Sequence, residues 1–239
     1  MTDSQDSTPR RRFLQTLAIV PASTLAAGAA LKTSQAETLA NAPPAGAAYA
    51  PAYFDKAEWA FIQAAVDHLI PADDLGPGAL IAGVPEFIDR QMETPYGHGK
   101  LWYMQGPFHP DVDPTYGWQI SLVPREVYRH GIADCNAYCG KQYGKSFIDL
   151  DKAIQEQVLK DMEAGKPQFA NVPSKTFFGQ LLGNTKEGFL SDPQYGGNRH
   201  MVGWKMLGFT GARGDFVGWP EQGNVKYPYG PVSISGEKA

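Results

Sequence analysis

Apolar side chains recur at helical spacing along much of the chain after residue 52. The clearest run begins after Asp55, which forms a capping-box pattern with Glu58 three residues later. Apolar residues then return every three or four positions until Pro71 ends the run. This pattern predicts an amphipathic helix between Asp55 and Pro71. Its expected apolar face consists of Trp59, Ile62, Val66 and Leu69.

Five further segments show helical signals. Pro85 and Pro124 each stand at an expected first helical position, and Ser174 stands where a cap residue is favoured. A fourth helix should end near Gly165, and a short one is expected over residues 199–207. The apolar positions of the four longer segments are Phe87, Ile88 and Met92; Tyr128, Ile132, Cys135 and Cys139; Ile154, Val158 and Met162; and Phe177, Phe178, Leu181, Leu182 and Thr185.

The segments between these helices are rich in glycine, proline and aromatic residues. Residues 93–121 have no helical or strand period and exceed the usual length of an unstructured loop, which indicates a functional loop or an interface. After Phe209 the chain has the same composition, so we expect it to run extended along a neighbour or over the helices. No internal repeat and no convincing pair of strands is present. The sequence therefore predicts a mainly α protein, with a single helical domain over residues 53–239, long ordered loops and an extended C-terminal segment.

The first 42 residues have the pattern of an export signal. A basic start is followed by a stretch without charge up to Lys32. Arg10 and Arg11, followed after one residue by Phe13-Leu14, resemble the signals read by the twin-arginine translocase of bacteria. Ala40-Asn41-Ala42 fits a cleavage site, although a retained anchor is the alternative. We therefore expect residues 1–42 to direct export to the periplasm and residues 43–52 to be a linker. The residues expected to be read as the signal are Arg10, Arg11, Phe13 and Leu14.

The balance of charged and aromatic residues excludes some classes of function. The whole chain has 21 Lys and Arg and 25 Asp and Glu; 4 and 3 of these lie in residues 1–42, which leaves 17 and 22 in residues 43–239. This negative balance excludes a nucleic-acid arm or a polybasic membrane patch. Charged residues make up 19% of the chain and aromatic residues 12%. A chain poor in charge and rich in aromatic rings suits a protein that covers part of its surface with a partner.

The chain has no recognisable cofactor motif of its own. It lacks a Gly-x-Gly-x-x-Gly turn after a strand, a Cys-x-x-Cys-His haem motif and a Gly-x-Ser-x-Gly elbow. Two cysteines are too few for an iron–sulfur cluster. We therefore expect no catalytic residue and no cofactor in this chain. One alternative is an independent periplasmic enzyme with a metal held by His68, Asp73 and Asp74, and another is a protein that binds a small ligand.

Cys135 and Cys139 stand four residues apart on one predicted helix. Their Cβ atoms should lie about 5–6 Å apart, whereas a disulfide needs roughly 3.5–4.5 Å. Three interpretations remain open: two buried thiols, a disulfide between one of them and another subunit, and a strained local bridge.

Several sequence blocks resemble one family, the small third subunit of bacterial membrane-bound gluconate 2-dehydrogenases. The strongest block runs from Asn184 to Pro193 and continues through Tyr195-Gly196-Gly197-Asn198 to Gly203-Trp204. Weaker blocks include residues 53–62, 67–73 and 83–89. The resemblance covers about residues 50 to 235.

The resemblance implies a subunit of a three-part complex. A large subunit of the glucose–methanol–choline oxidoreductase type would hold FAD, and a multihaem cytochrome c subunit would pass electrons to quinone. The small subunit would carry the export signal for the large one and would lie on the periplasmic face of the cytoplasmic membrane. Its partner surface is expected in residues 93–121, 191–204 and 213–235. The candidate interface residues are Tyr96, Trp102, Tyr195, Asn198, Trp204, Tyr227 and Tyr229, and the alternative for the aromatic ones is that they cover the chain's own core.

Overall fold

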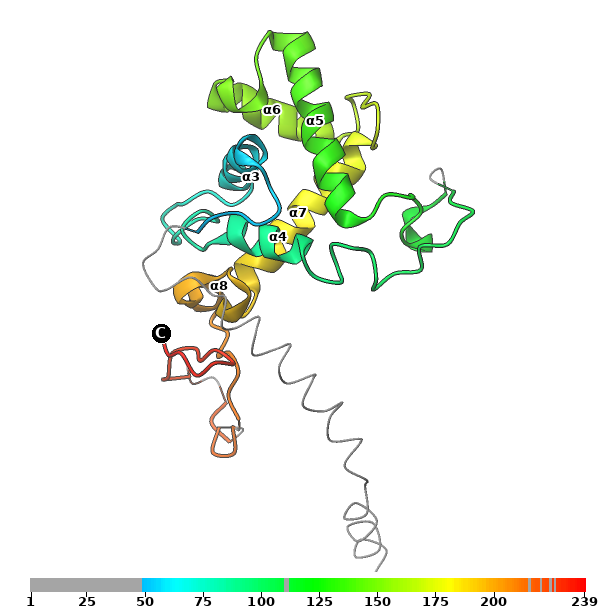
Figure 1. Cartoon of the computed structure of the whole chain (residues 1–239). Coiled ribbons are helices and arrows are strands. Elements are labelled where there is room, and N and C mark those ends of the chain that lie inside the picture. Colours follow the sequence, from blue (N-terminus) through cyan, green and yellow to red (C-terminus); the bar gives the residue numbers. More distant parts are fainter. Residues whose placement is uncertain (1–48, 110–111, 215, 220, 224, 226) are drawn as a thin grey trace, which may run out of the picture. The chain divides into compact units, whose positions relative to one another are not determined.

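Six α-helices and four short 3₁₀ helices make up the secondary structure of the described part of the chain (Figure 1). The computed structural model describes residues 49–109, 112–214, 216–219, 221–223, 225 and 227–239. Contacts divide the chain into two units, Met1–Tyr49 and Ala50–Ala239, and the second contains all the helices described here. The helices are α3 (Lys56–Leu69), α4 (Val84–Met92), α5 (Pro124–Tyr143), α6 (Lys152–Glu163), α7 (Ser174–Leu190) and α8 (Val202–Leu207), with η1 (Pro114–Tyr116), η2 (Phe147–Asp149), η3 (Pro193–Tyr195) and η4 (Arg199–Met201).

The mainly α prediction is confirmed. Among the residues described, only isolated β-bridges occur and no strand ladder forms. The predicted capping box of α3 is present, because Asp55 accepts from the N–H of Glu58 at 2.9 Å and Glu58 accepts from the N–H of Asp55 at 3.1 Å. Ser174 is not the cap of α7 as expected. Pro173 occupies that position and Ser174 is the first helical residue, with no side-chain cap bond.

Helix α7 is the central element of the domain, and it contacts α3, α4, α5, α6 and α8 (Figure 1). Its Phe177 is fully buried, and its ring lies 6.0 Å from the ring of Phe61 on α3 and 6.1 Å from that of Tyr128 on α5. The apolar faces predicted from the sequence meet here, so the hydrophobic core is built around this helix.

Two glycines set the distance between α7 and its neighbours. A Cβ atom on Gly131 of α5 would lie 2.3 Å from the ring of Phe177, and one on Gly188 of α7 would lie 2.8 Å from the ring of Phe87 on α4. No larger side chain fits at either position without moving a helix. The sequence does not single out these glycines, because a helix pattern does not show which residue faces a ring on another helix.

The C-terminal segment folds back on itself through isolated bridges of Val232 with Gly211 and with Lys238, and it is tied to the helical domain. The N–H of Ala212 donates to the carbonyl of Val232 at 2.7 Å. The N–H of Ile234 donates to the buried carboxylate of Asp192 at 2.7 Å. No described helix is long and apolar enough to cross a membrane.

Candidate functional site

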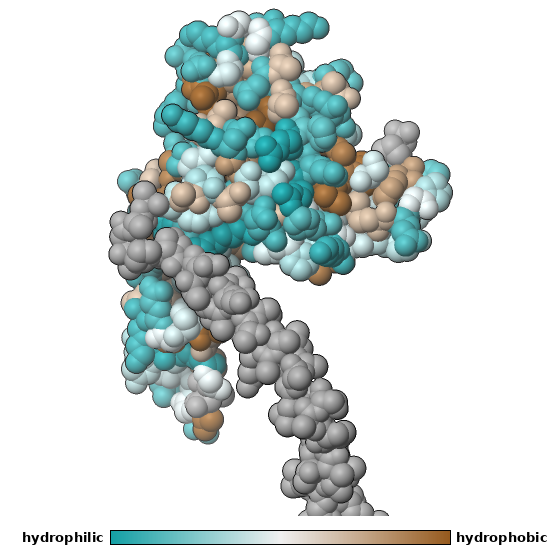
Figure 2. Space-filling model, viewed as in Figure 1, coloured by the Kyte–Doolittle hydropathy of each residue, from teal (hydrophilic) through white to brown (hydrophobic). Residues whose placement is uncertain are grey.

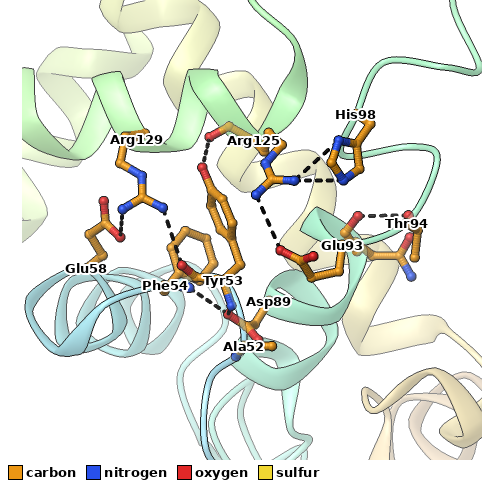
Figure 3. Close-up of polar contacts among 11 residues, drawn as sticks. Ala52, Tyr53, Phe54, Glu58, Asp89, Glu93, Thr94, His98, Arg125 and Arg129 are labelled. Atoms are coloured by element: carbon orange, nitrogen blue, oxygen red, sulfur yellow. Dashed lines mark hydrogen bonds and ion pairs between the residues drawn. The ribbon is translucent and has the colours of Figure 1, made fainter. Parts of the chain in front are cut away.

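The chain segment that follows the predicted linker is fastened to helix α4 (Figure 3). The fully buried carboxylate of Asp89 accepts hydrogen bonds from the backbone N–H groups of Ala52, Tyr53 and Phe54 at 2.7, 3.1 and 2.9 Å. Three donors offset the cost of burying this polar group. We call this contact the N-terminal clamp.

The ring of Tyr53 extends the clamp to helix α5. It lies between two guanidinium groups, those of Arg125 and Arg129, at 4.5 and 4.6 Å from the ring centroid (Figure 3). The Tyr53 hydroxyl donates to the carbonyl of Arg125 at 2.6 Å, and Arg129 pairs with Glu58 of α3 at 3.1 Å. Burial raises the pKa of the Glu58 carboxyl, and Arg129 opposes that rise. The clamp thus joins three helices to residues 52–54.

Inward-facing aromatic rings hold the loop between α4 and α5 against the domain. The rings of Trp102 and Trp118 lie 4.6 Å apart, and Tyr96 meets Trp102 edge to face at 5.5 Å. The Tyr96 hydroxyl accepts hydrogen bonds from Gln180 and Asn184 of α7 at 2.5 and 2.9 Å. These half-buried rings brace the loop from within.

Other apolar residues of the same loop face outward. Leu101, Tyr103 and Tyr116 are 67%, 77% and 73% exposed. Leu101 and Tyr103 flank the half-buried Trp102, so neighbouring side chains alternate between the domain and solvent. Figure 2 shows tan and brown patches among white and teal ones over this part of the molecule. The loop therefore has an exposed apolar surface on a braced backbone.

The segment that leads from α7 to α8 contains three left-handed residues that are not glycine. Asn198, His200 and Met201 have φ angles of 44°, 56° and 54°. This conformation costs roughly 1–2 kcal/mol for an ordinary residue, and asparagine tolerates it better. We call residues 196–203 the left-handed turn. Such a turn persists only where its surroundings hold it.

Buried polar contacts hold the left-handed turn in place. The fully buried Asn198 donates to the carbonyl of Ser191 at 2.8 Å and accepts from the N–H of Gly203 at 2.8 Å. The indole of Trp204, also buried, donates to the carbonyl of Leu190 at 2.7 Å. Asn198 and Trp204 were predicted as interface residues, but their side chains lie inside this chain and shape the turn.

The left-handed turn is also joined to the start of α4. The N–H of Arg199 donates to the carbonyl of Ala82 at 2.9 Å, and its guanidinium pairs with the buried Glu86. Glu86 also pairs with Arg90 at 2.5 Å. Two guanidinium groups therefore share one carboxylate beneath the turn.

Basic and apolar side chains are exposed around the left-handed turn. Residues 193–208 contain Arg199, His200 and Lys205 and no acidic residue. His200 and Lys205 are exposed, and the side chain of Arg199 is 45% exposed. We call the exposed residues of this region the basic corner: Ile81, Tyr195, Arg199, His200, Lys205, Met206 and Leu207.

Aromatic residues of the C-terminal segment pack on one another. The guanidinium of Arg213 lies 5.2 and 5.3 Å from the ring centroids of Tyr227 and Tyr229 and donates to the carbonyl of Gly230 at 2.6 Å. Tyr227 is half-buried, whereas Tyr229 is 64% exposed. Of these two predicted interface residues, Tyr229 is thus the one with the larger free surface.

Both cysteines are buried and free in α5. The neighbouring Cys139 thiol and burial raise the pKa of Cys135 well above its ordinary value, whereas the Cys135 thiol lowers the pKa of Cys139. A thiol that is buried and protonated reacts slowly. This arrangement favours the first of the three interpretations, two buried thiols.

Two of the three residues proposed as metal ligands make other contacts. His68 Nε2 lies 2.9 Å from Gln155 Oε1, and Asp73 accepts from the N–H of Leu75 at 2.8 Å. No group of three or more His, Cys, Asp or Glu side chains that could hold a metal ion occurs in the described part of the chain.

Sequence reasoning and structure agree only in part on the candidate residues. Tyr195 and Tyr229 are exposed, Tyr96, Trp102 and Tyr227 are half-buried, and the export-signal residues Arg10, Arg11, Phe13 and Leu14 lie outside the described residues. Arg199 and His200 lie within the expected segment 191–204 but were not among the candidate interface residues, and Lys205 lies just beyond that segment. The absence of acidic residues from 193–208 was the signal that could have identified them.

Comparison with known proteins gives one match. The family described as gluconate 2-dehydrogenase subunit 3 matches residues 56–211, well over half of the chain. No curated protein and no solved structure matches. The match begins at the first residue of α3 and ends beyond the basic corner, so it includes both the braced loop and the left-handed turn. The chain therefore belongs to the gluconate 2-dehydrogenase subunit 3 family.

Proposed function

We propose that this chain is a non-catalytic small subunit of a membrane-bound dehydrogenase that faces the periplasm. Its partners are a FAD-binding subunit of the glucose–methanol–choline type, which oxidises gluconate or a related sugar, and a multihaem cytochrome c subunit that passes electrons to quinone. The observation that carries this proposal is the family match over residues 56–211. The exposed apolar side chains of the loop between α4 and α5 support it, because a subunit needs a surface to bury.

The small subunit also escorts the flavoprotein during export. Residues 1–42 have the pattern of a twin-arginine signal, and that route is generally used for cargo that folds before it crosses the membrane. This chain has no cofactor motif that would explain such a route by itself. A folded partner that carries FAD explains it.

Replacement of both Arg10 and Arg11 by lysine tests the escort role. The double variant is expected to leave this subunit and the flavoprotein in the cytoplasm, because the translocase no longer reads the signal. The measurement is the flavin content and dehydrogenase activity of the periplasmic and membrane fractions compared with the cytoplasm.

Arg12→Lys is the matched control, because it changes a neighbouring arginine outside the pair and should leave export near normal. Normal export of the flavoprotein in the Arg10→Lys, Arg11→Lys variant would refute the escort role.

A further inference from the structure

We propose that the basic corner binds an acidic, partly apolar surface of the folded FAD-binding partner. This inference rests on the proposed function, since it names the place where this chain meets that partner. Of the three segments expected to meet the partner, it selects residues 191–204, and it adds exposed neighbours outside them, namely Ile81 and residues 205–207.

The backbone of the left-handed turn is fixed by buried hydrogen bonds. Three residues that are not glycine adopt left-handed φ angles in residues 198–201. Asn198 is fully buried and bonds both Ser191 and Gly203, so the turn is held from within. Strain of this kind is concentrated at functional sites. A pre-shaped surface loses less conformational entropy on binding than a mobile one.

The charge of the basic corner is opposite to that of the chain as a whole. With histidine counted as neutral, the protein has a formal net charge of −4, whereas residues 193–208 contain Arg199 and Lys205 and no acidic residue. The nearby carboxylate of Glu86 is buried and shared by Arg90 and Arg199. A partner surface with exposed carboxylates complements this distribution.

Apolar side chains lie among these charges. Ile81, Tyr195, Met206 and Leu207 are 59%, 48%, 49% and 61% exposed. Ile81 is next to Ala82, whose carbonyl bonds the N–H of Arg199, so the two segments are neighbours in space. Apolar anchors with charged neighbours are typical of protein–protein interfaces.

A protein partner explains the basic corner better than a lipid surface does. Polybasic segments that bind anionic membranes have about 4–8 Lys or Arg side chains. The basic corner has Arg199, Lys205 and a histidine. A fluid headgroup layer also does not require a strained and pre-shaped backbone, whereas a folded partner can match one.

Co-purification from native membranes tests this inference. The tagged full-length subunit is purified in wild-type form and as His200→Gly and Lys205→Glu, and the flavin absorbance of each eluate is divided by the amount of subunit. Each variant is expected to retain about tenfold less flavin than the wild type, because it removes a ring or reverses a charge in the interface. Added salt should weaken retention of the wild type.

The variants separate binding from folding. Glycine favours the left-handed conformation, so His200→Gly should unfold at the same urea concentration as the wild type or a higher one. Lys175→Glu is the matched control for Lys205→Glu, because Lys175 is an exposed lysine at the start of α7, outside the three segments expected to meet the partner, and this variant should retain flavin fully.

Each outcome decides between the two proposals. Full flavin retention by both corner variants overturns this inference and leaves the proposed function in place, whereas a wild-type eluate without flavin contradicts both. If the variants keep flavin but lose binding to anionic lipid vesicles, or lose self-association, then the basic corner serves a membrane or a second copy instead.

Discussion

Single polar residues tie distant parts of this domain together. Asn184 is buried on α7, and it accepts from the Tyr128 hydroxyl at 3.0 Å and donates to the Tyr96 hydroxyl at 2.9 Å. It therefore links α5 and the loop after α4 to the central helix. The sequence placed Tyr128 on an apolar face correctly, but it contained no signal for the amide that satisfies its hydroxyl, since that partner lies 56 residues away.

The buried phenol of Tyr128 should make the folded protein less stable as the pH rises into the alkaline range. Burial raises its pKa well above the ordinary value of 10.0. Above about pH 10 the unfolded chain releases the phenol proton while the folded protein keeps it, so stability falls as pH rises. Tyr128→Phe should cost about 1 kcal/mol near neutral pH through the lost hydrogen bond. The difference in the free energy of unfolding between wild type and variant should then shrink, or change sign, between about pH 9 and pH 11.

Urea unfolding at a series of pH values measures this effect. Tyr103→Phe is the control, because the Tyr103 side chain is 77% exposed and lies outside the core. A difference between wild type and Tyr128→Phe that stays constant over the series would contradict the prediction.

At the scale of elements, the hydrophobic pattern identified every α-helix of the described domain. The helical spacing of apolar residues and the cap residues are local signals in the sequence. They were enough to predict α3 together with its capping box. The error at Ser174 has a local cause as well, since Pro173 precedes it and takes the cap position. How the helices pack was not predictable, because Gly131 is ordinary in a helix until the ring of Phe177 lies against it.

Gly131→Ala tests the close packing of α5 on α7. The new methyl group would meet the Phe177 ring at 2.3 Å, so the helices must separate and the free energy of unfolding should fall by about 1–3 kcal/mol. Gly140→Ala is the matched control near the exposed C-terminal end of the same helix, where the new Cβ would have no neighbour within 4 Å beyond its own helix. That change should stabilise the protein by roughly 0.5–1 kcal/mol. Equal urea midpoints for the two variants would show that α5 and α7 are not in close contact at Gly131.

At the scale of the whole molecule, the N-terminal clamp fastens residues 52–54 to helix α4. Its first hydrogen bond comes from Ala52, ten residues beyond the expected cleavage site. A chain that begins at residue 43 should therefore unfold within about 2–4 °C of the full-length protein, which corresponds to about 1 kcal/mol for a domain of this size. Thermal unfolding followed by circular dichroism measures the two midpoints.

Asp89→Asn in the shortened chain is the comparison variant for the clamp. This change weakens an acceptor for three backbone N–H groups, so the thermal unfolding midpoint should fall by well over 4 °C. A large loss of stability in the shortened chain with Asp89 intact would mean that residues 1–42 contribute to the folded domain.

The sequence by itself determined the helices, the mainly α class, the loop-rich composition and the family, because each depends on residue identity within short windows. Tertiary structure alone decided which residues face outward. It turned Trp102 and Trp204 toward the domain, left Leu101 and Tyr103 exposed, and placed Arg199 and His200 on a strained turn. The physical reason is that exposure depends on which distant segments pack against a residue, and a local pattern contains no record of those contacts.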